Sequence, residues 1–126
     1  MSPEQRMVKE FHEKYDAPAR GTPTMISPKD CLRRARLIFT EAGEFIEAAD
    51  TSDVVEMVDA LADLLVVVYG AAVEMGVDLE PVFAEVHRSN MSKNGGIDPG
   101  GKILKGPGFS PPDIVGELRK QGFQPA

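Results

Sequence analysis

Carboxylates at helical spacing in two apolar segments are the residues of this sequence best suited to chemistry. Around the run DALADLLVVVY, the most apolar in the chain, Glu56, Asp59 and Asp63 are spaced i, i+3 and i+7. This spacing places them on one helix face about 60° wide. In the preceding segment Glu41 points out of the middle of an apolar stripe, and Glu44 lies at its edge. A carboxylate in an apolar interior is very costly without a partner. We therefore expect the two faces to meet around a shared cation.

A hard divalent cation is the partner that best fits such a cluster. Several carboxylates that converge without a counter-charge repel one another and raise one another's pKa values. Mg²⁺ prefers oxygen ligands, with Mn²⁺ as a substitute. A di-iron site is disfavoured, because Glu85-Val86-His87 lacks the Glu-x-x-His spacing of ferritin-like proteins. The candidate metal ligands are Glu41, Glu44, Glu56, Asp59 and Asp63.

The simpler interpretation of acidic residues on helices is a solvated face. We favour this interpretation for Glu47 and Glu74. Glu56 has a second explanation as well, because an acid in the first turn of a helix stabilises the helix through its macrodipole. For Glu41 and Asp63 the solvated interpretation is weaker, because their neighbours are mostly apolar.

Basic residues follow the acidic segments and suit phosphate binding. They lie in HRSNMSKNGGIDPGGKILKGPGF, whose glycines allow a close approach of the backbone to a ligand. The alternative is a solvated connector with scattered lysines. A P-loop enzyme is excluded, because no Gly-x-x-x-x-Gly-Lys-Ser/Thr element is present. The candidate phosphate-binding residues are Arg88, Lys93, Lys102 and Lys105, with Asn90 as a hydrogen-bonding helper.

Length and composition limit the remaining possibilities. A chain of 126 residues fits a single domain, residues 1–126. The net charge of −6 argues against a nucleic-acid partner held by overall electrostatics. One cysteine excludes an internal disulfide and favours a reducing cytoplasm. The polar N-terminal segment does not resemble a signal peptide, and Asp63 interrupts the only long apolar run, so we expect no membrane span.

Start and stop signals predict an all-α protein. Ser-Pro pairs open helices at residues 3–15 and 28–49, and Gly76 ends a third helix that spans about 53–75. Asp78 caps a fourth helix, and Ser110-Pro111 starts a short last helix that ends near Gly122. The short connections favour an antiparallel bundle of four main helices plus the short C-terminal one.

With these residues in view, the sequence resembles the MazG-like all-α nucleoside triphosphate pyrophosphohydrolases. The family pattern is Glu-x-x-Glu on one helix and Glu-x-x-Asp on the next, matched here by EAGE (Glu41, Glu44) and EMVD (Glu56, Asp59), with the further Asp63. The segment YGAAVEMGVDLEPVFAEVHRSNMSK looks most like the phage and bacterial branch, which includes deinococcal-type dimeric dUTP pyrophosphatases. The resemblance covers roughly residues 5–113.

The resemblance implies a reaction and an assembly. Family members bind Mg²⁺ through these acids, and an activated water attacks a phosphate to give a nucleoside monophosphate and pyrophosphate. They form homodimers or dimers of dimers. By this analogy Glu41, Glu44 and Glu47 are the candidate catalytic residues, with Glu44 or Glu47 as the proton acceptor. Two departures affect the roles. Thr40 replaces a second Glu of many relatives, and Ala60 replaces a Glu that others carry, so Asp59 or Glu56 must take that ligand's place.

Three functions remain in competition. The first is hydrolysis of dUTP or another deoxynucleoside triphosphate. The second, phosphoribosyl-ATP pyrophosphohydrolase, differs in substrate and not in chemistry. The third is a non-catalytic dimeric helical module. The sequence does not identify the base, and Phe11, His12 and Phe109 are the candidates for stacking on it.

Overall fold

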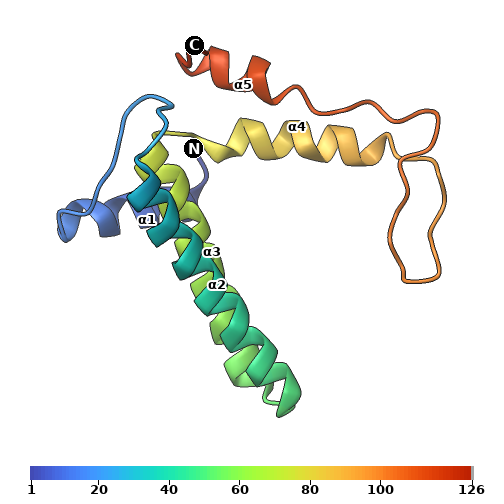
Figure 1. The fold of residues 1–126 in the computed structure, drawn as a ribbon, viewed down its shortest axis with the longest axis horizontal. Helices are drawn as coiled ribbons and strands as arrows, with labels where there is room; N and C mark the ends of the chain where they lie inside the picture. The colour runs from blue at the N-terminus through green and yellow to red at the C-terminus, as the bar shows by residue number, and fades with distance from the viewer. Residues whose placement is uncertain (126) are drawn as a thin grey trace.

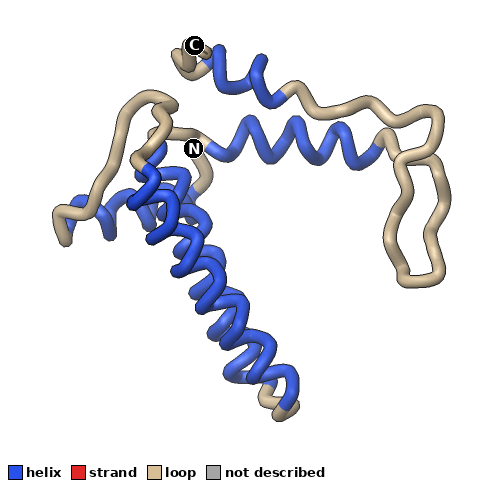
Figure 2. The backbone as a smooth tube through the Cα atoms, viewed as in Figure 1, coloured by secondary structure: helices blue, strands red, loops and turns tan. Residues whose placement is uncertain are grey.

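The computed structural model describes residues 1–125 and contains five α-helices within that range (Figures 1 and 2). The all-α class predicted from the sequence is confirmed. The helices are α1 (Pro3–Lys14), α2 (Pro28–Asp50), α3 (Val54–Met75), α4 (Leu79–Met91) and α5 (Ile114–Lys120).

Each of the four main helices begins at a capping side chain. The Ser2 hydroxyl accepts a hydrogen bond from the backbone N–H of the third helical residue of α1, and Ser27 does the same for α2. In both helices proline occupies the first position, where no N–H is needed. Asp53 and Asp78 cap α3 and α4 through their carboxylates. The sequence predicted the caps Ser2, Ser27 and Asp78, whereas for α3 it suggested Asp50, Thr51 or Ser52 and the structure uses Asp53.

The helices α2 and α3 form a long antiparallel hairpin, with α1 packed against α3 (Figure 1). Small side chains allow the hairpin helices to approach closely. Ala48, Ala60 and Ala72 are all buried, and Gly70 leaves the space that the guanidinium of Arg34 occupies. A Cβ at position 70 would lie 2.1 Å from that guanidinium nitrogen, so a side chain here would displace the end of Arg34.

The chain bends by 114° between α3 and α4. Gly76 ends α3 in the left-handed conformation (φ 75°), and α4 starts only three residues later. Consequently α4 makes its main helix contacts with α5 rather than with the hairpin (Figure 1). The predicted helices are present, but among them only α2 and α3 form an antiparallel pair; α1 packs across α3, and α4 leads away from the hairpin (Figure 1).

Two glutamine side chains hold this bend. Gln5 of α1 is almost completely buried; its Nε2 donates to the Val77 carbonyl at 2.7 Å and its Oε1 accepts from the Leu79 N–H at 3.0 Å. Gln121, just after α5, accepts from the Asp78 N–H at 2.8 Å and donates to the Asp78 carbonyl at 2.9 Å. Buried backbone groups are costly without partners, so these two side chains stabilise the direction of α4.

The last helix starts later than the sequence predicted. Its N-cap is Asp113, which accepts from the Gly116 N–H at 2.9 Å, and not Ser110-Pro111. The prediction failed because Ser110 has another role: its N–H donates to the Ser92 hydroxyl at 2.8 Å, which fastens this segment to the end of α4. The end near Gly122 is confirmed.

No single helix among the described residues has the length and apolar character needed to cross a membrane. Only α3 and α4 taken together, across their 114° bend, meet those criteria.

Replacing Gln5 with Ala should lower the free energy of unfolding by about 2 to 4 kcal/mol. The substitution orphans one buried carbonyl and one buried N–H, each worth about 1 to 3 kcal/mol. Urea denaturation measures the change, and Glu10→Ala on the exposed side of α1 is the matched control. Equal stability of the two variants would show that the bend does not depend on Gln5.

Candidate metal site

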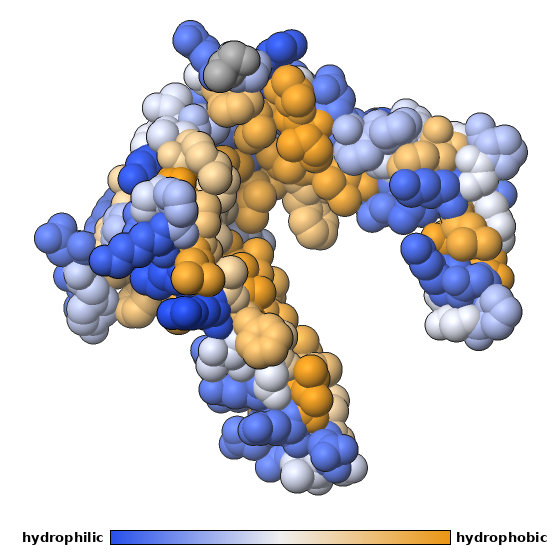
Figure 3. All heavy atoms as spheres, in the orientation of Figure 1, coloured by the Kyte–Doolittle hydropathy of each residue, from blue (hydrophilic) through white to orange (hydrophobic). Residues whose placement is uncertain are grey.

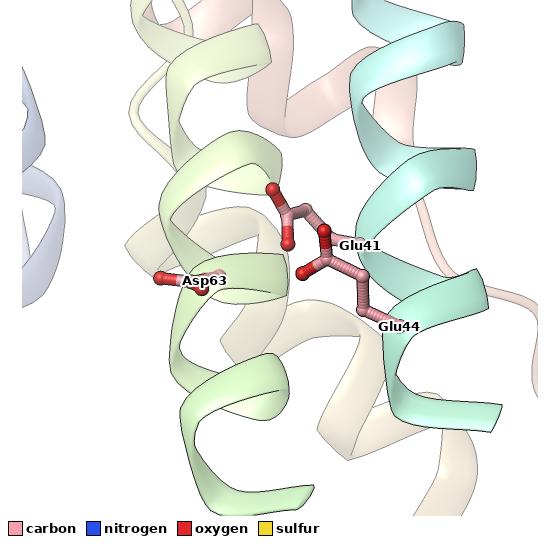
Figure 4. Close-up of side chains that lie close together, drawn as sticks. All are labelled: Glu41, Glu44 and Asp63. Carbon is pink, nitrogen blue, oxygen red and sulfur yellow. The ribbon is translucent and has the colours of Figure 1, made fainter. Parts of the chain in front are cut away.

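Three carboxylates from the two hairpin helices converge at one point. Glu41 and Glu44 project from α2 toward α3, which carries Asp63 at the same level of the helix pair (Figure 4). One carboxylate oxygen from each lies within 4.8 Å of the others. This is the meeting of the two acidic faces that the helical spacing predicted.

Glu41 is the most constrained of the three. Its Oε2 atom is buried and has no hydrogen-bond partner among the described residues. Burial raises the pKa of the Glu41 carboxyl, and a hydrogen bond with Glu44 and the negative charges of Glu44, Asp63 and Asp59 raise it further. No ion pair among the described residues involves Glu41, Glu44 or Asp63. The charged form of Glu41 therefore lacks a counter-charge in this chain.

The donor set fits a hard divalent cation. It consists only of carboxylate oxygens, and one of them is buried without a partner, where a positive ion would satisfy it. Glu41, Glu44 and Asp63 are the residues that would hold such an ion.

The other two predicted ligands, Glu56 and Asp59, lie outside the three-carboxylate cluster. Both are exposed and line a groove on the hairpin together with Glu44, Glu47 and Thr51. Asp59 is close enough to contribute to the raised pKa of Glu41. Glu47 is exposed as well, in agreement with its predicted solvated position. The groove gives these side chains access to a ligand beside the cluster.

Arg88, predicted to bind phosphate, is already engaged on its own helix. Its guanidinium pairs with Glu85 at 2.7 Å and also donates to the Ser110 hydroxyl and the Pro111 carbonyl, each at 3.1 Å. The Arg88 hydrogen bonds, together with the Asp113 N–H, lower the pKa of Glu85 to about 2. Arg88 thus fastens the chain before α5 to α4.

The remaining candidate phosphate-binding residues are not brought to the carboxylates by this chain. Asn90 lies exposed near the end of α4, Lys93 is half-buried just after it, and Lys102 and Lys105 are exposed in the loop beyond. Because α4 turns away from the hairpin, its far end and the loop that follows lie apart from the hairpin (Figure 1).

The stacking candidates are spread over the molecule. Phe11 is exposed and packs edge-on against Tyr15, with ring centroids 5.2 Å apart. His12 is buried, and its Nδ1 lies 2.9 Å from the Pro18 carbonyl oxygen. Phe109 carries the Lys105 ammonium 5.1 Å above its ring.

The prediction that Glu74 lies on a solvated face is wrong. Its side chain is fully buried and forms ion pairs with Arg33 and Arg34, the second at 3.8 Å. Arg33 and Arg34 lie on α2, about forty residues before Glu74 in the sequence. The spacing of residues along α3 therefore could not predict these ion pairs. The only available signal was Gly70, one turn before Glu74, which makes space for Arg34.

Comparison with known proteins gives one match. The sequence profile described as phosphoribosyl-ATP pyrophosphohydrolase matches residues 8–90, a range that includes all of α2, α3 and the three converging carboxylates. No curated protein matches the chain.

Replacing Glu41 with Gln should stabilise the metal-free protein at pH 8. The pKa of Glu41 is raised in the folded state above the ordinary value of 4.5, so above that pH the unfolded state releases the Glu41 proton more readily than the folded state does. The free energy of unfolding therefore falls as the pH rises. Glutamine removes this penalty and can donate to Glu44.

Thermal unfolding in EDTA between pH 4 and pH 8 measures this effect. The melting temperature of Glu41→Gln should exceed that of the wild type at pH 8, and the difference should vanish toward pH 4. Glu47→Gln, an exposed neighbour on α2, is the control and should show no such trend. A lower melting temperature of Glu41→Gln at pH 8 would contradict the description of the site.

Proposed function

The chain belongs to the phosphoribosyl-ATP pyrophosphohydrolase family, whose members are enzymes acting on acid anhydrides, and from this premise we propose that it hydrolyses a deoxynucleoside triphosphate to the monophosphate and pyrophosphate with Mg²⁺. The observation that carries the proposal is the convergence of Glu41, Glu44 and Asp63 with a buried, unpartnered oxygen. Carboxylate clusters with open positions on a divalent ion are typical of phosphate chemistry.

The residues divide into two tasks. Glu41, Glu44 and Asp63 hold the ion, and Asp59 and Glu56 extend the acidic surface along the groove. When bound, Mg²⁺ lowers the pKa of water and neutralises charge on the phosphates, and Mn²⁺ is a possible substitute. Glu47 is exposed in the same groove and outside the cluster, so it is free to accept the proton of the attacking water; Glu44 is the alternative acceptor.

The leaving pyrophosphate needs positive charge, and the part of the hairpin that carries the carboxylate cluster, residues 37–75, contains no basic residue. Phosphoryl transfer depends mainly on positioning and electrostatic stabilisation. Lys93, Lys102 and Lys105, with Asn90, are the groups suited to this task, but they lie at the end of α4 and beyond it. We propose that the active protein is a homodimer or a dimer of dimers in which these residues come from a neighbouring copy.

Exposed apolar surface supports this assembly. Phe39, Val55 and Phe83 are each at least 72% exposed. Apolar side chains gather along the hairpin and on the inner side of the α3–α4 bend (Figure 3). Leu65 and Phe83 lie on either side of an apolar pocket at this bend. Contiguous apolar surface of this kind marks a site of association.

The substrate has two candidates of the same chemical class. One candidate is phosphoribosyl-ATP, because the matching family is named after the hydrolysis of this compound. The segment VVVYGAAVEMGVDL…EVHRSNMSK favours a deoxynucleoside triphosphate, by resemblance to the dUTP-directed branch.

The free, half-buried Cys31 agrees with a cytoplasmic location, which we also propose.

Incubation with each nucleoside triphosphate, and with phosphoribosyl-ATP, should yield monophosphate and pyrophosphate only when Mg²⁺ is present. Anion-exchange chromatography separates these products from diphosphate and phosphate. The preferred substrate is the one with the highest kcat/KM. Formation of diphosphate and phosphate would contradict the proposed bond cleavage, and inactivity on every substrate would favour the non-catalytic helical module.

Asp63→Asn should reduce kcat by about 100-fold, because it removes one charged ligand at nearly constant volume. Asp16→Asn, an exposed acid after α1, is the matched control and should retain the wild-type rate. Circular dichroism of both variants verifies folding. A wild-type rate for Asp63→Asn with saturating Mg²⁺ would contradict the assignment of the ligand.

A further inference from the structure

A cavity of about 260 Å³ lies against the bend between α3 and α4. We call it the bend cavity. Its wall combines α1, the loop after α1, the end of α3 and the residue that follows α5. None of the candidate metal ligands lines it. Its polar and charged lining residues include Gln5, Lys9, Arg20, Asp78 and Gln121.

The wall of the bend cavity carries positive charge without a counter-charge. Lys9 and Arg20 line the cavity, and no ion pair among residues 1–125 involves either of them. The carboxylate of Asp78, which lines the cavity as well, is already paired with the Met1 amine at 3.2 Å and accepts from the Glu80 N–H at 3.1 Å. Two cations therefore remain available to an anion.

A structural role explains part of this arrangement. The Arg20 N–H donates to the Val73 carbonyl at 3.1 Å, and its Nη1 donates to the Glu74 carbonyl at 2.7 Å. A cation at the C-terminal end of a helix is also favoured by the helix macrodipole. The guanidinium has five N–H donors, however, and the bond to Glu74 uses one of them. The end of α3 also gives no reason for the exposed Lys9, which belongs to α1.

The bend cavity is preformed. A Cβ at Gly76 would lie 2.3 Å from the Thr22 carbonyl oxygen, so the loop after α1 packs directly on the end of α3. Gln5 and Gln121 fix the backbone of the bend by four hydrogen bonds. A preformed concave site with a few fixed polar groups is typical of small-molecule binding.

We propose that the bend cavity binds a small multivalent anion of the phosphate type and that the bound anion stabilises the direction of α4. Lys9 and Arg20 would donate charge-assisted hydrogen bonds to the anion oxygens. Two cations suit an anion that carries at least two negative charges. The volume is sufficient for inorganic phosphate, for pyrophosphate or for the phosphate end of a nucleoside monophosphate.

The link to α4 follows from the composition of the wall. The cavity exists only while α1, the loop after it and the bend are packed together. A ligand that binds only this packed arrangement stabilises it by mass action. The N–H groups of Asp78 and Leu79, which donate to Gln121 and Gln5, therefore exchange more slowly with solvent when the anion is bound.

Thermal unfolding and isothermal titration calorimetry in EDTA test the site. Inorganic phosphate, pyrophosphate and a nucleoside monophosphate are added separately, with the ionic strength kept constant by NaCl. Without a metal ion the carboxylate cluster carries no positive charge and repels these probes. At least one probe should bind saturably and raise the melting temperature, and the tightest of the three identifies the source of the anion.

The variant Lys9→Gln removes one of the two cations from an exposed position, so the fold should not depend on it. Its dissociation constant for the tightest probe should be at least about fivefold higher than that of the wild type. The control Lys14→Gln removes an exposed lysine at the end of the same helix and should bind like the wild type. Absence of binding by all three probes, or equal binding by Lys9→Gln and the wild type, would overturn the site.

Hydrogen exchange read by mass spectrometry tests the link to α4. Saturation with the tightest probe should slow exchange in peptides that cover Asp78 and Leu79, and Lys9→Gln at the same probe concentration should show less slowing. Unchanged exchange at the bend in the saturated wild type would refute the stabilisation of α4.

The test is independent of turnover. Pyrophosphate and the monophosphate are products of the proposed reaction, so only their role as natural ligands rests on the proposed function. Anion binding that Lys9→Gln weakens, in a protein that hydrolyses nothing, would uphold the site and refute the proposed function. Hydrolysis by a protein that binds none of the probes in EDTA would do the reverse.

Discussion

The structure depends on how one long acidic stretch is neutralised. Residues 37–86 contain twelve carboxylates and no lysine, arginine or histidine. These residues form most of the hairpin and the first part of α4, so the only basic residues of these helices lie at the start of α2 and in the second half of α4. Carboxylates brought together in a folded chain repel one another unless each finds water, a helix N-terminus or a cation.

The fold satisfies four of these acids in identifiable ways. Asp53 and Asp78 cap helices, where the N-terminal dipole and free N–H groups favour negative charge. Glu74 is buried against arginines of α2, and Glu85 is paired with Arg88. What remains is the cluster of Glu41, Glu44 and Asp63 and the exposed acids beside it. The site is thus the part of the acidic stretch that the chain leaves unneutralised, and an external cation is the simplest partner.

Local signals in the sequence were sufficient to predict the helices and the acidic face. Ser-Pro pairs, Asp78 and Gly76 mark helix ends to within a residue or two, and the i, i+3, i+7 spacing placed Asp63 on the side of α3 where its carboxylate lies close to those of Glu41 and Glu44. The last helix was misplaced because Ser110 is used in a contact with Ser92, a residue far away in the sequence. Glu74 was misjudged for the same reason, since its arginine partners lie on another helix.

The direction of α4 also could not be predicted from the sequence. It is set by Gln5 and Gln121, two polar residues near opposite ends of the chain whose hydrogen bonds to the bend no periodicity reveals. This direction separates the candidate phosphate-binding residues from the candidate metal ligands within one chain, although the two groups follow one another in the sequence. The second copy that we propose follows from this division.

Binding of Mn²⁺ to the protein without nucleotide tests the central claim most directly. Electron paramagnetic resonance of free Mn²⁺ counts the ions removed from solution as the protein is added. The account predicts saturable binding by the wild type and a loss of affinity of at least about tenfold in Asp63→Asn. Binding by Asp63→Asn that equals the wild type, or no saturable binding by either protein, would contradict it.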